Sequence, residues 1–178
     1  MHPFIVIEGL MASGKTTLAK SLAKRLGGKY CKTPLEPFQS ARTLVDRYAP
    51  NVARFYFYVS AVYHANLSIR RWLLEGPVVC DKYIHSTLAF HRAMSVPCDD
   101  KWINWVIKPD IVLLLDAQRS TRALRLTQRH HQPAQLPDSD FENEVLLRFR
   151  AFDLQTLHTD SLSPEQTTDR ALRLICGH

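Results

Sequence analysis

The sequence lacks the segments that mark membrane and secreted proteins. Among its 178 residues, no apolar run reaches the roughly 20 residues that a membrane-spanning helix needs. The N-terminal residues Met1-His2-Pro3-Phe4 do not form the charged segment and long apolar stretch of a signal peptide. We therefore expect a cytoplasmic protein with no membrane partner.

Cysteine is scarce and is not spaced for a metal site or a disulfide framework. The sequence has four cysteines, at Cys31, Cys80, Cys98 and Cys176, and no two of them form a C-x-x-C pair. Zinc sites and small disulfide-bonded folds need closer or more regular spacing. We interpret all four as reduced thiols, which agrees with a cytoplasmic location.

A nucleic-acid-binding motif is also missing, although the formal net charge is +6. A basic protein of this size invites a nucleic-acid interpretation. Here the lysines and arginines are not gathered in runs, and no internal repeat or low-complexity tract is present. We interpret the excess charge as a surface that attracts small polyphosphates, and we expect no nucleic-acid partner.

Short β-branched runs alternate along the chain with longer amphipathic stretches. Strands are predicted at residues 4–7, 29–33, 78–80 and 111–115. Helices are predicted at residues 15–26, 52–75, 83–94, 101–107, 118–129, 141–157 and 164–175. Such alternation is typical of an α/β fold with a parallel sheet. We expect one domain over residues 1–178, with a five-stranded parallel sheet and helices on both faces.

Prolines and one capping pattern refine these boundaries. Pro34 and Pro37 predict a loop after the second strand, and residues 130–140 predict a polar loop between two helices. The segment Ser163-Pro164-Glu165-Gln166 has a serine N-cap, proline at the first helical position and glutamine three residues after the serine. This pattern predicts the start of the last helix.

A glycine-rich loop follows the first predicted strand. The segment from Gly9 to Thr16 matches G-x-x-x-x-G-K-[ST]. Glycines let several backbone N–H groups point at one anion, and the next helix offers its N-terminus to phosphate. Lys15 would bring a positive charge to the β- and γ-phosphates, and the Thr16 hydroxyl would bind Mg²⁺. We expect ATP on this loop, bound by Gly9, Met11, Ala12, Ser13, Gly14, Lys15, Thr16 and Thr17.

The loop alone does not choose between kinases, ATPases and GTPases. A GTPase-type switch would need a base-specificity motif such as Asn-Lys-x-Asp, and the sequence has none. A nucleotide-binding switch that turns over no acceptor nevertheless remains an alternative at this point.

The middle of the chain resembles the thymidylate kinase family. The third predicted strand runs into Asp81-Lys82-Tyr83, followed by Ser86 and Ala89-Phe90. This is similar to the family's Asp-Arg-Tyr…Ser…Ala-Tyr/Phe signature. Leu35-Glu36-Pro37 resembles the family's Arg-Glu-Pro. The related deoxynucleoside kinases are a second match, mainly through the glycine-rich loop and Glu36-Pro37.

The resemblance implies a P-loop NTPase fold, and it also implies roles for individual residues. Asp81 would lie near Mg²⁺, and Lys82 would replace the family arginine that bridges the donor and acceptor phosphates. Phe57 would stack on the acceptor base, while Tyr83 and Phe90 would line its pocket. A lid at about residues 128–142 would close over ATP, with contacts from Arg119, Arg122 and Arg125. Family members are commonly dimers, so a homodimer is a further expectation.

Some positions depart from the family pattern. Leu35 and Ala61 stand where the family has arginines that hold the acceptor's phosphate, and Met11 replaces an acidic residue that faces the sugar. We therefore expect a nucleoside-like acceptor without a phosphate, with Glu36 as the base that orients its hydroxyl. Arg42, Arg47 and Arg54 lie nearby in sequence and could replace the missing charges. Conversion of dTMP to dTDP is therefore the alternative.

Overall fold

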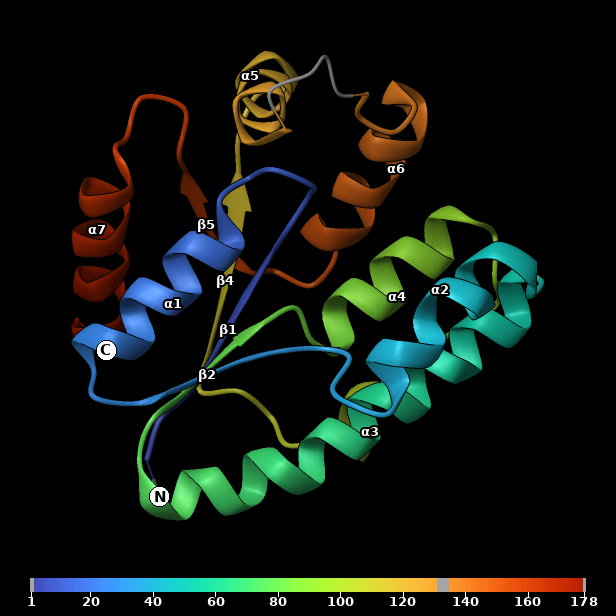
Figure 1. Ribbon diagram of the computed structural model, residues 1–178, viewed down its shortest axis with the longest axis horizontal. Helices are drawn as coiled ribbons and strands as arrows, with labels where there is room; N and C mark the ends of the chain where they lie inside the picture. The colour runs from blue at the N-terminus through green and yellow to red at the C-terminus, as the bar shows by residue number, and fades with distance from the viewer. Residues whose placement is uncertain (1, 131–134, 178) are drawn as a thin grey trace.

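The computed structural model describes residues 2–130 and 135–177. Within them the apolar runs form one five-stranded sheet in the order β2-β3-β1-β4-β5, and every neighbouring pair is parallel (Figure 1). The strands are β1 (Phe4–Gly9), β2 (Lys29–Lys32), β3 (Val78–Asp81), β4 (Ile111–Asp116) and β5 (Gln155–His158). The predicted α/β fold with a five-stranded parallel sheet is confirmed.

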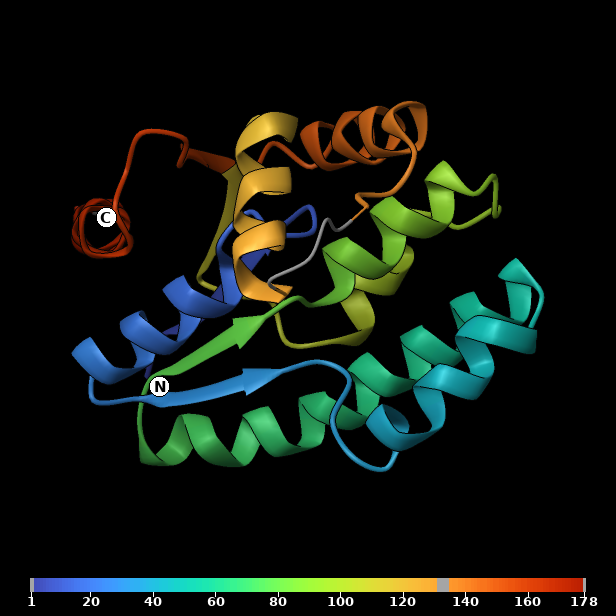
Figure 2. The same ribbon diagram turned by 45° about the horizontal axis from the view of Figure 1, so that its top comes forward.

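The helices cover both faces of the sheet and its carboxyl edge (Figures 1 and 2). They are α1 (Lys15–Arg25), α2 (Phe38–Tyr48), α3 (Asn51–Glu75), α4 (Ile84–Ala93), the 3₁₀ helix η1 (Asp100–Trp105), α5 (Arg119–His130), α6 (Ser139–Arg150) and α7 (Pro164–Cys176). No helix in the described part of the chain is both long and apolar enough to cross a membrane.

Strand β1 lies at the centre of the sheet and is buried along its whole length. Because alternate side chains of a strand point to opposite faces, one short run supplies two cores. Ile5 and Ile7 pack with α1 and α7, whereas Phe4 and Val6 pack with α3 and α4. This double burial explains why the sequence of β1 is an unbroken apolar run. It also fixes the end of β1, and therefore the loop after it.

The prediction of one helix over residues 141–157 was wrong. Helix α6 ends at Arg150, and Gln155–His158 form β5, which pairs with β4 at Leu113 to Asp116. Asp153 has a φ of +52°, a left-handed conformation that a continuing helix does not contain. Strand β5 lies at the sheet edge and buries only Leu157 completely, so it lacks the apolar run that reveals a central strand.

Two other elements differ from the prediction, and two agree closely. The prolines at Pro34 and Pro37 lead directly into α2, which the sequence did not predict, and η1 replaces the α-helix expected at residues 101–107. Helix α3 begins one residue before the predicted start and ends where predicted. The capping pattern of α7 is confirmed: Ser163 Oγ accepts from the Gln166 backbone N–H, and Gln166 Oε1 accepts from that of Ser163.

The predicted lid at residues 128–142 begins in α5 and ends in α6. Its residues 131–134 lie outside the described residues. The described flanks lie beyond the carboxyl ends of β1 and β4, on the side of the sheet where the glycine-rich loop emerges (Figure 1).

Candidate active site

The loop between β1 and α1 has a backbone that only glycine fits at two positions. Gly9 has a φ of +139°, and a Cβ there would lie 2.4 Å from the carbonyl oxygen of Leu115. Gly14 has a φ of +103° and immediately precedes the first residue of α1. Side chains would be strained at both positions. The predicted motif therefore takes the strand-loop-helix setting that phosphate binding needs.

Lys15 is buried inside this loop. Its ammonium donates to the Leu10 carbonyl and to Ser13 Oγ. Burial, together with the nearby positive charge of Lys82, lowers the pKa of Lys15 to about 7. Both effects disfavour the charged form, and a bound phosphate would oppose them. A bound phosphate could therefore replace the Leu10 carbonyl and Ser13 Oγ as the hydrogen-bond partner of Lys15.

Thr16 and Asp81 meet where the end of β3 lies beside the start of α1. Thr16 Oγ1 donates to Asp81 Oδ2, and Asp81 is 1% exposed. The other carboxylate oxygen, Oδ1, is buried without a hydrogen-bond partner in the described structure.

This pair fits a magnesium ion that is shared with phosphate. The described residues contain no group of three His, Cys, Asp or Glu side chains that could hold a metal by themselves. Mg²⁺ commonly takes only one or two protein oxygens, and it fills its other positions with water and substrate phosphates. A hydroxyl beside a buried carboxylate oxygen with no partner matches that requirement.

Lys82 follows Asp81 at a sharp turn of the chain. Its φ of +69° lies in the left-handed region, which lysine rarely adopts. The turn separates the two side chains, so that Asp81 faces α1 while the Lys82 ammonium lies 5.5 Å from the centre of the Phe90 ring on α4. Burial lowers the pKa of Lys82.

Glu8 holds the start of α4 in place behind this turn. Its carboxylate accepts from the backbone N–H groups of Tyr83 and Ser86 and from the Ser86 hydroxyl. Glu8 is completely buried, and this burial raises its pKa to about 7. Its role as the link between β1 and α4 depends on the parallel pairing of β1 with β3.

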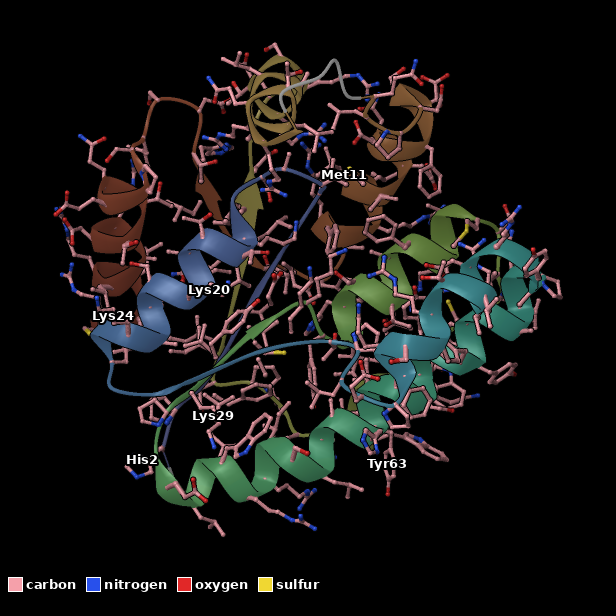
Figure 3. All side chains as sticks on the ribbon, viewed as in Figure 1. His2, Met11, Lys20, Lys24, Lys29 and Tyr63 are labelled. Atoms are coloured by element: carbon pink, nitrogen blue, oxygen red, sulfur yellow. The ribbon has the colours of Figure 1, made fainter. Side chains whose placement is uncertain are left out.

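A cavity of about 350 Å³, here named the α4-side cavity, lies beside Lys82. The residues of α4 that line it recur at helical spacing. Arg42 and Asp46 of α2 and Arg54 and Tyr58 of α3 also line it. The α4 wall consists of Tyr83, Ser86, Thr87, Phe90, His91 and Met94. Leu10 and Met11 of the glycine-rich loop close one end, and Figure 3 shows Met11 at the tip of that loop. Tyr83 and Phe90, which were expected to line the acceptor pocket, both line this cavity.

Asp46 organises the polar side of the α4-side cavity. It accepts from Arg42 Nε at 3.1 Å and from the Tyr58 hydroxyl at 2.8 Å, and Arg54 Nε lies 4.0 Å from its Oδ1. Lys82 and two arginines line the cavity with two carboxylates, Asp46 and Glu142, and because Glu142 is already paired with Arg122 the cavity is left positive. The sequence showed only that Arg42 and Arg54 lie close to each other along the chain. In the structure, α2 carries Arg42 and α3 carries Arg54 to the polar side of this cavity.

Two predicted residues do not line this cavity in the described structure. The Glu36 carboxylate is exposed and accepts from the Ser40 N–H at 3.1 Å and the Ser40 hydroxyl at 2.7 Å, in the first turn of α2. The Phe57 ring packs against Phe38, with 5.4 Å between ring centres. The roles of Glu36 as a base and of Phe57 as a stacking residue therefore stay predictions.

A second cavity, of about 240 Å³, lies on the other side of the glycine-rich loop and is here named the α7-side cavity. Ala12, Ser13, Gly14 and Thr17 line it together with Arg125 of α5 and the start of α7. Arg125 donates to the carbonyl oxygens of Ser13 at 3.2 Å and Thr159 at 2.6 Å. Successive residues of one loop thus face two different cavities.

Arg119 and Arg122 were expected to contact ATP with Arg125, but both are paired with Glu142 of α6. Arg122 is 3% exposed; its two terminal nitrogens donate to the two Glu142 oxygens at 2.7 and 2.8 Å. Arg122 also donates to the carbonyl of Met11 at 3.3 Å, and Arg119 donates to Glu142 Oε2. This cluster joins α5, α6 and the glycine-rich loop. Glu142 was missed because nothing in its local sequence indicates a buried carboxylate.

Replacing Arg122 by alanine should lower the free energy of unfolding by about 3–5 kcal/mol, because the buried Glu142 would lose its bidentate partner. Arg148→Ala is the matched control: Arg148 pairs with Glu144 on the same helix, but their side chains are 42% and 36% exposed. Its loss should be about 1 kcal/mol or less. Urea unfolding followed by circular dichroism measures both, and equal small losses would contradict the buried role of Arg122.

Comparisons with known proteins agree with this geometry. A sequence model of the thymidylate kinase family matches residues 7–159. The chain belongs to the thymidylate kinase family. Probable thymidylate kinases of Sulfurisphaera tokodaii and Methanocaldococcus jannaschii are 29% and 32% identical to it. The first alignment covers 99% of this chain and 97% of the relative, and the second covers 69% of each.

Solved thymidylate kinase structures share the fold. The enzyme of Candida albicans superposes with a TM-score of 0.78 at 18% identity, covering 99% of this chain and 92% of the other. The enzyme of Ehrlichia chaffeensis gives 0.76 at 19% identity, covering 98% of each chain. Membership of the thymidylate kinase family makes this chain a phosphotransferase, a nucleotide kinase with a P-loop. The resemblance, the fold and the enzyme class predicted from the sequence are confirmed.

Proposed function

We propose that the chain transfers the γ-phosphoryl group of ATP to dTMP and produces dTDP. The observation that carries this proposal is the positive charge of the α4-side cavity. Arg42 and Lys82 both line the cavity. Burial is the main cause of the lowered pKa of Lys82; Glu8 and Asp81 raise this pKa, and the charge of Arg42 lowers it. Two cations facing one space repel each other unless an anion lies between them. An acceptor phosphate is such an anion.

This proposal replaces the unphosphorylated acceptor that the sequence favoured. That expectation depended on Leu35 and Ala61, which stand at the positions of two family arginines. Arg42 brings a charge to the same cavity from α2, a helix that the sequence did not predict. The names of the relatives, all probable or established thymidylate kinases, also favour dTMP.

On the donor side, we infer that ATP extends from the α7-side cavity across the glycine-rich loop. The residues from Gly9 to Thr17 would surround the phosphates, and Lys15 would leave the Leu10 carbonyl to contact them. Thr16 and Asp81 would hold Mg²⁺, which neutralises charge on the β- and γ-phosphates when bound. Arg125 already lines this side. Direct contacts from Arg119 and Arg122, and closure of the lid at residues 128–142, stay predictions.

The proposed reaction needs positioning more than proton transfer. A monophosphate acceptor is already ionised, so no base has to take a proton from it, and Glu36 is not required for that purpose. Lys82 lies at the end of the cavity nearest the loop and would approach both the transferred group and the acceptor phosphate. Charge neutralisation by Lys15 and Lys82 then supports the transfer.

The acceptor is tested by comparing dTMP with thymidine at saturating ATP and Mg²⁺, and by replacing Arg42 with glutamine. We expect turnover of dTMP only. Arg42→Gln should raise KM for dTMP about 10- to 100-fold, because one charge-assisted hydrogen bond is lost. Arg47→Gln is the control, since Arg47 lies on the same helix but stacks on Tyr48 outside the cavity. Turnover of thymidine in preference to dTMP, or equal effects of the two substitutions, would overturn the proposal.

We also infer that two copies pair through the outward face of α3. Val52, Tyr56, Tyr63 and Leu67 are each about half exposed, and Leu74 is 77% exposed. At 3.6 residues per turn these side chains fall within a sector of about 60°. Figure 3 shows Tyr63 on the outer side of the helix. A continuous exposed apolar stripe is typical of a protein interface, and sedimentation of the purified protein would show whether it dimerises.

A further inference from the structure

Helix α5 holds the glycine-rich loop from outside through two backbone carbonyl groups. Arg122 Nη1 donates to the Met11 carbonyl at 3.3 Å. Arg125 Nη1 donates to the Ser13 carbonyl at 3.2 Å. Between these two residues of the loop lies Ala12, whose φ of +61° is in the left-handed region. Residues other than glycine keep this unfavourable conformation only where their surroundings hold it, so the two arginines stabilise the strained part of the loop.

A fixed carbonyl group also sets the direction of the N–H group that follows it. The C=O and N–H of a trans peptide lie in one plane and point in opposite directions. Because the Met11 carbonyl faces Arg122, the Ala12 N–H points away from that guanidinium. The Gly14 N–H likewise points away from Arg125. Neither N–H donates to an acceptor among the described residues, and such free backbone donors on one turn of chain are suited to bind an anion.

Arg122 is fixed in turn by Glu142, and both residues are buried. Its Nε donates to the Ala117 carbonyl at 3.1 Å, and its two terminal nitrogens donate to the two Glu142 oxygens. A bidentate pair of this kind favours one relative orientation, so the nitrogen that reaches Met11 has a set position. Arg122 lines neither of the two cavities, whereas Arg125 lines the α7-side cavity. Arg122 therefore contacts the loop and not the space in which the substrates would lie.

We propose that Arg122 is a positioning residue for phosphoryl transfer: held by Glu142, it fixes the Met11 peptide so that the Ala12 N–H faces the donor phosphates. This inference rests on the proposed function, which places the phosphates of ATP on the glycine-rich loop. The charge of Arg122 is already balanced by Glu142. Its effect on ATP binding therefore comes from the geometry of the loop rather than from added charge.

The test removes the ion pair and keeps the net charge. In a double variant with Arg122→Met and Glu142→Met, apolar side chains of similar length fill the same space. Replacing a buried ion pair by well-packed apolar residues is often neutral or stabilising, so the urea midpoint of unfolding should stay near that of the wild type. Calorimetry should show about 10-fold weaker binding of Mg·ATP, because the Ala12 N–H is no longer held toward phosphate. Mg·tripolyphosphate, which has no base or sugar, should weaken equally, and adenosine should bind as in the wild type.

The matched control is a second double variant, with Arg148→Met and Glu144→Met. These two residues form an ion pair on α6, are partly exposed, and line neither cavity. Their replacement also leaves the net charge unchanged, and all three ligands should bind as in the wild type. A loss of stability in the Arg122 and Glu142 double variant with unchanged affinity for Mg·ATP would show that this pair is only structural, and would overturn the proposal.

Glu142→Gln separates positioning from direct contact and does not depend on the double variant. Glutamine has nearly the same shape but accepts from Arg122 through one oxygen only, so Arg122 is held less firmly. Mg·ATP should then bind about 3- to 10-fold more weakly. If Arg122 instead contacted phosphate directly, its release from the carboxylate would strengthen this binding.

Unchanged or tighter binding of Mg·ATP by Glu142→Gln would therefore overturn the role of Arg122. A wild-type enzyme that binds neither Mg·ATP nor Mg·tripolyphosphate would refute the proposed donor site, and this inference with it. A wild-type enzyme that binds both, with variants that bind them equally well, would refute the positioning role alone, so the two failures give different results.

Discussion

Replacing Lys15 by alanine should lower kcat by about 10³-fold, while the protein stays folded. The reason is electrostatic: Lys15 is the buried cation of the glycine-rich loop, and its charge would stabilise the phosphates in the transition state. Its present partners, the Leu10 carbonyl and Ser13 Oγ, lie within the same loop, so no distant contact depends on it. Steady-state formation of ADP with dTMP as acceptor measures the effect.

Lys24→Ala is the matched control for this prediction. Lys24 lies on the same helix, is exposed and is far from the glycine-rich loop (Figure 3). Its removal should leave kcat within about twofold, because exposed charges away from a site contribute little. A Lys15→Ala enzyme with wild-type turnover would mean that the loop does not carry the chemistry.

Asp81→Asn should lower turnover by about 10²-fold and make it depend more strongly on magnesium. Asparagine has nearly the same shape and can still accept from Thr16, so the fold should tolerate it. It has no negative charge for Mg²⁺, and a lost ligand or its support costs 10- to 100-fold or more in affinity or activity. The measurement is kcat over a series of Mg²⁺ concentrations, where the variant should require more metal for half-maximal rate.

The control for this second prediction is Asp169→Asn. Asp169 is a half-exposed aspartate that pairs with Arg25 on the surface, with side chains 42% and 50% exposed. Its magnesium dependence should match the wild type. If Asp81→Asn also shows the wild-type magnesium dependence, the free Oδ1 atom is not a metal ligand and the site at the end of β3 must be reassigned.

How much of the fold the sequence could predict depends on burial. Strands β1, β3 and β4 contain runs of buried apolar residues, and such runs are visible in the sequence. Strand β5 lies at the edge with Leu157 as its one completely buried apolar residue, so it gave no such signal. Helix α2 has no fully buried residue. Its position on the surface explains why it was taken for a loop after Pro34 and Pro37.

The site divides in the same way between local and distant residues. The glycine-rich loop is one continuous motif, and Asp81 and Lys82 belong to another. Within each motif, residues that are neighbours in the sequence are also neighbours in the site. Arg42 and His91 reach one cavity from separate helices, and no spacing rule connects them. Glu36 and Phe57 were assigned by resemblance to the family, and in this chain neither lines the cavity. The expected acceptor changed from a nucleoside to dTMP for the same reason, because the positive charge that the sequence seemed to lack is supplied by another element, helix α2.

The glycine-rich loop is the wall between the two cavities: Leu10 and Met11 face one side, and Ala12, Ser13 and Gly14 face the other. The separation between donor and acceptor is therefore set by the thickness of a single stretch of backbone. Substrates on its two sides can meet only around the tip, where Arg122 holds the Met11 carbonyl. An inserted or deleted residue in this stretch would displace both substrates at once, so evolution of new acceptors in this scaffold should proceed by exchanging side chains, with the length of the loop conserved.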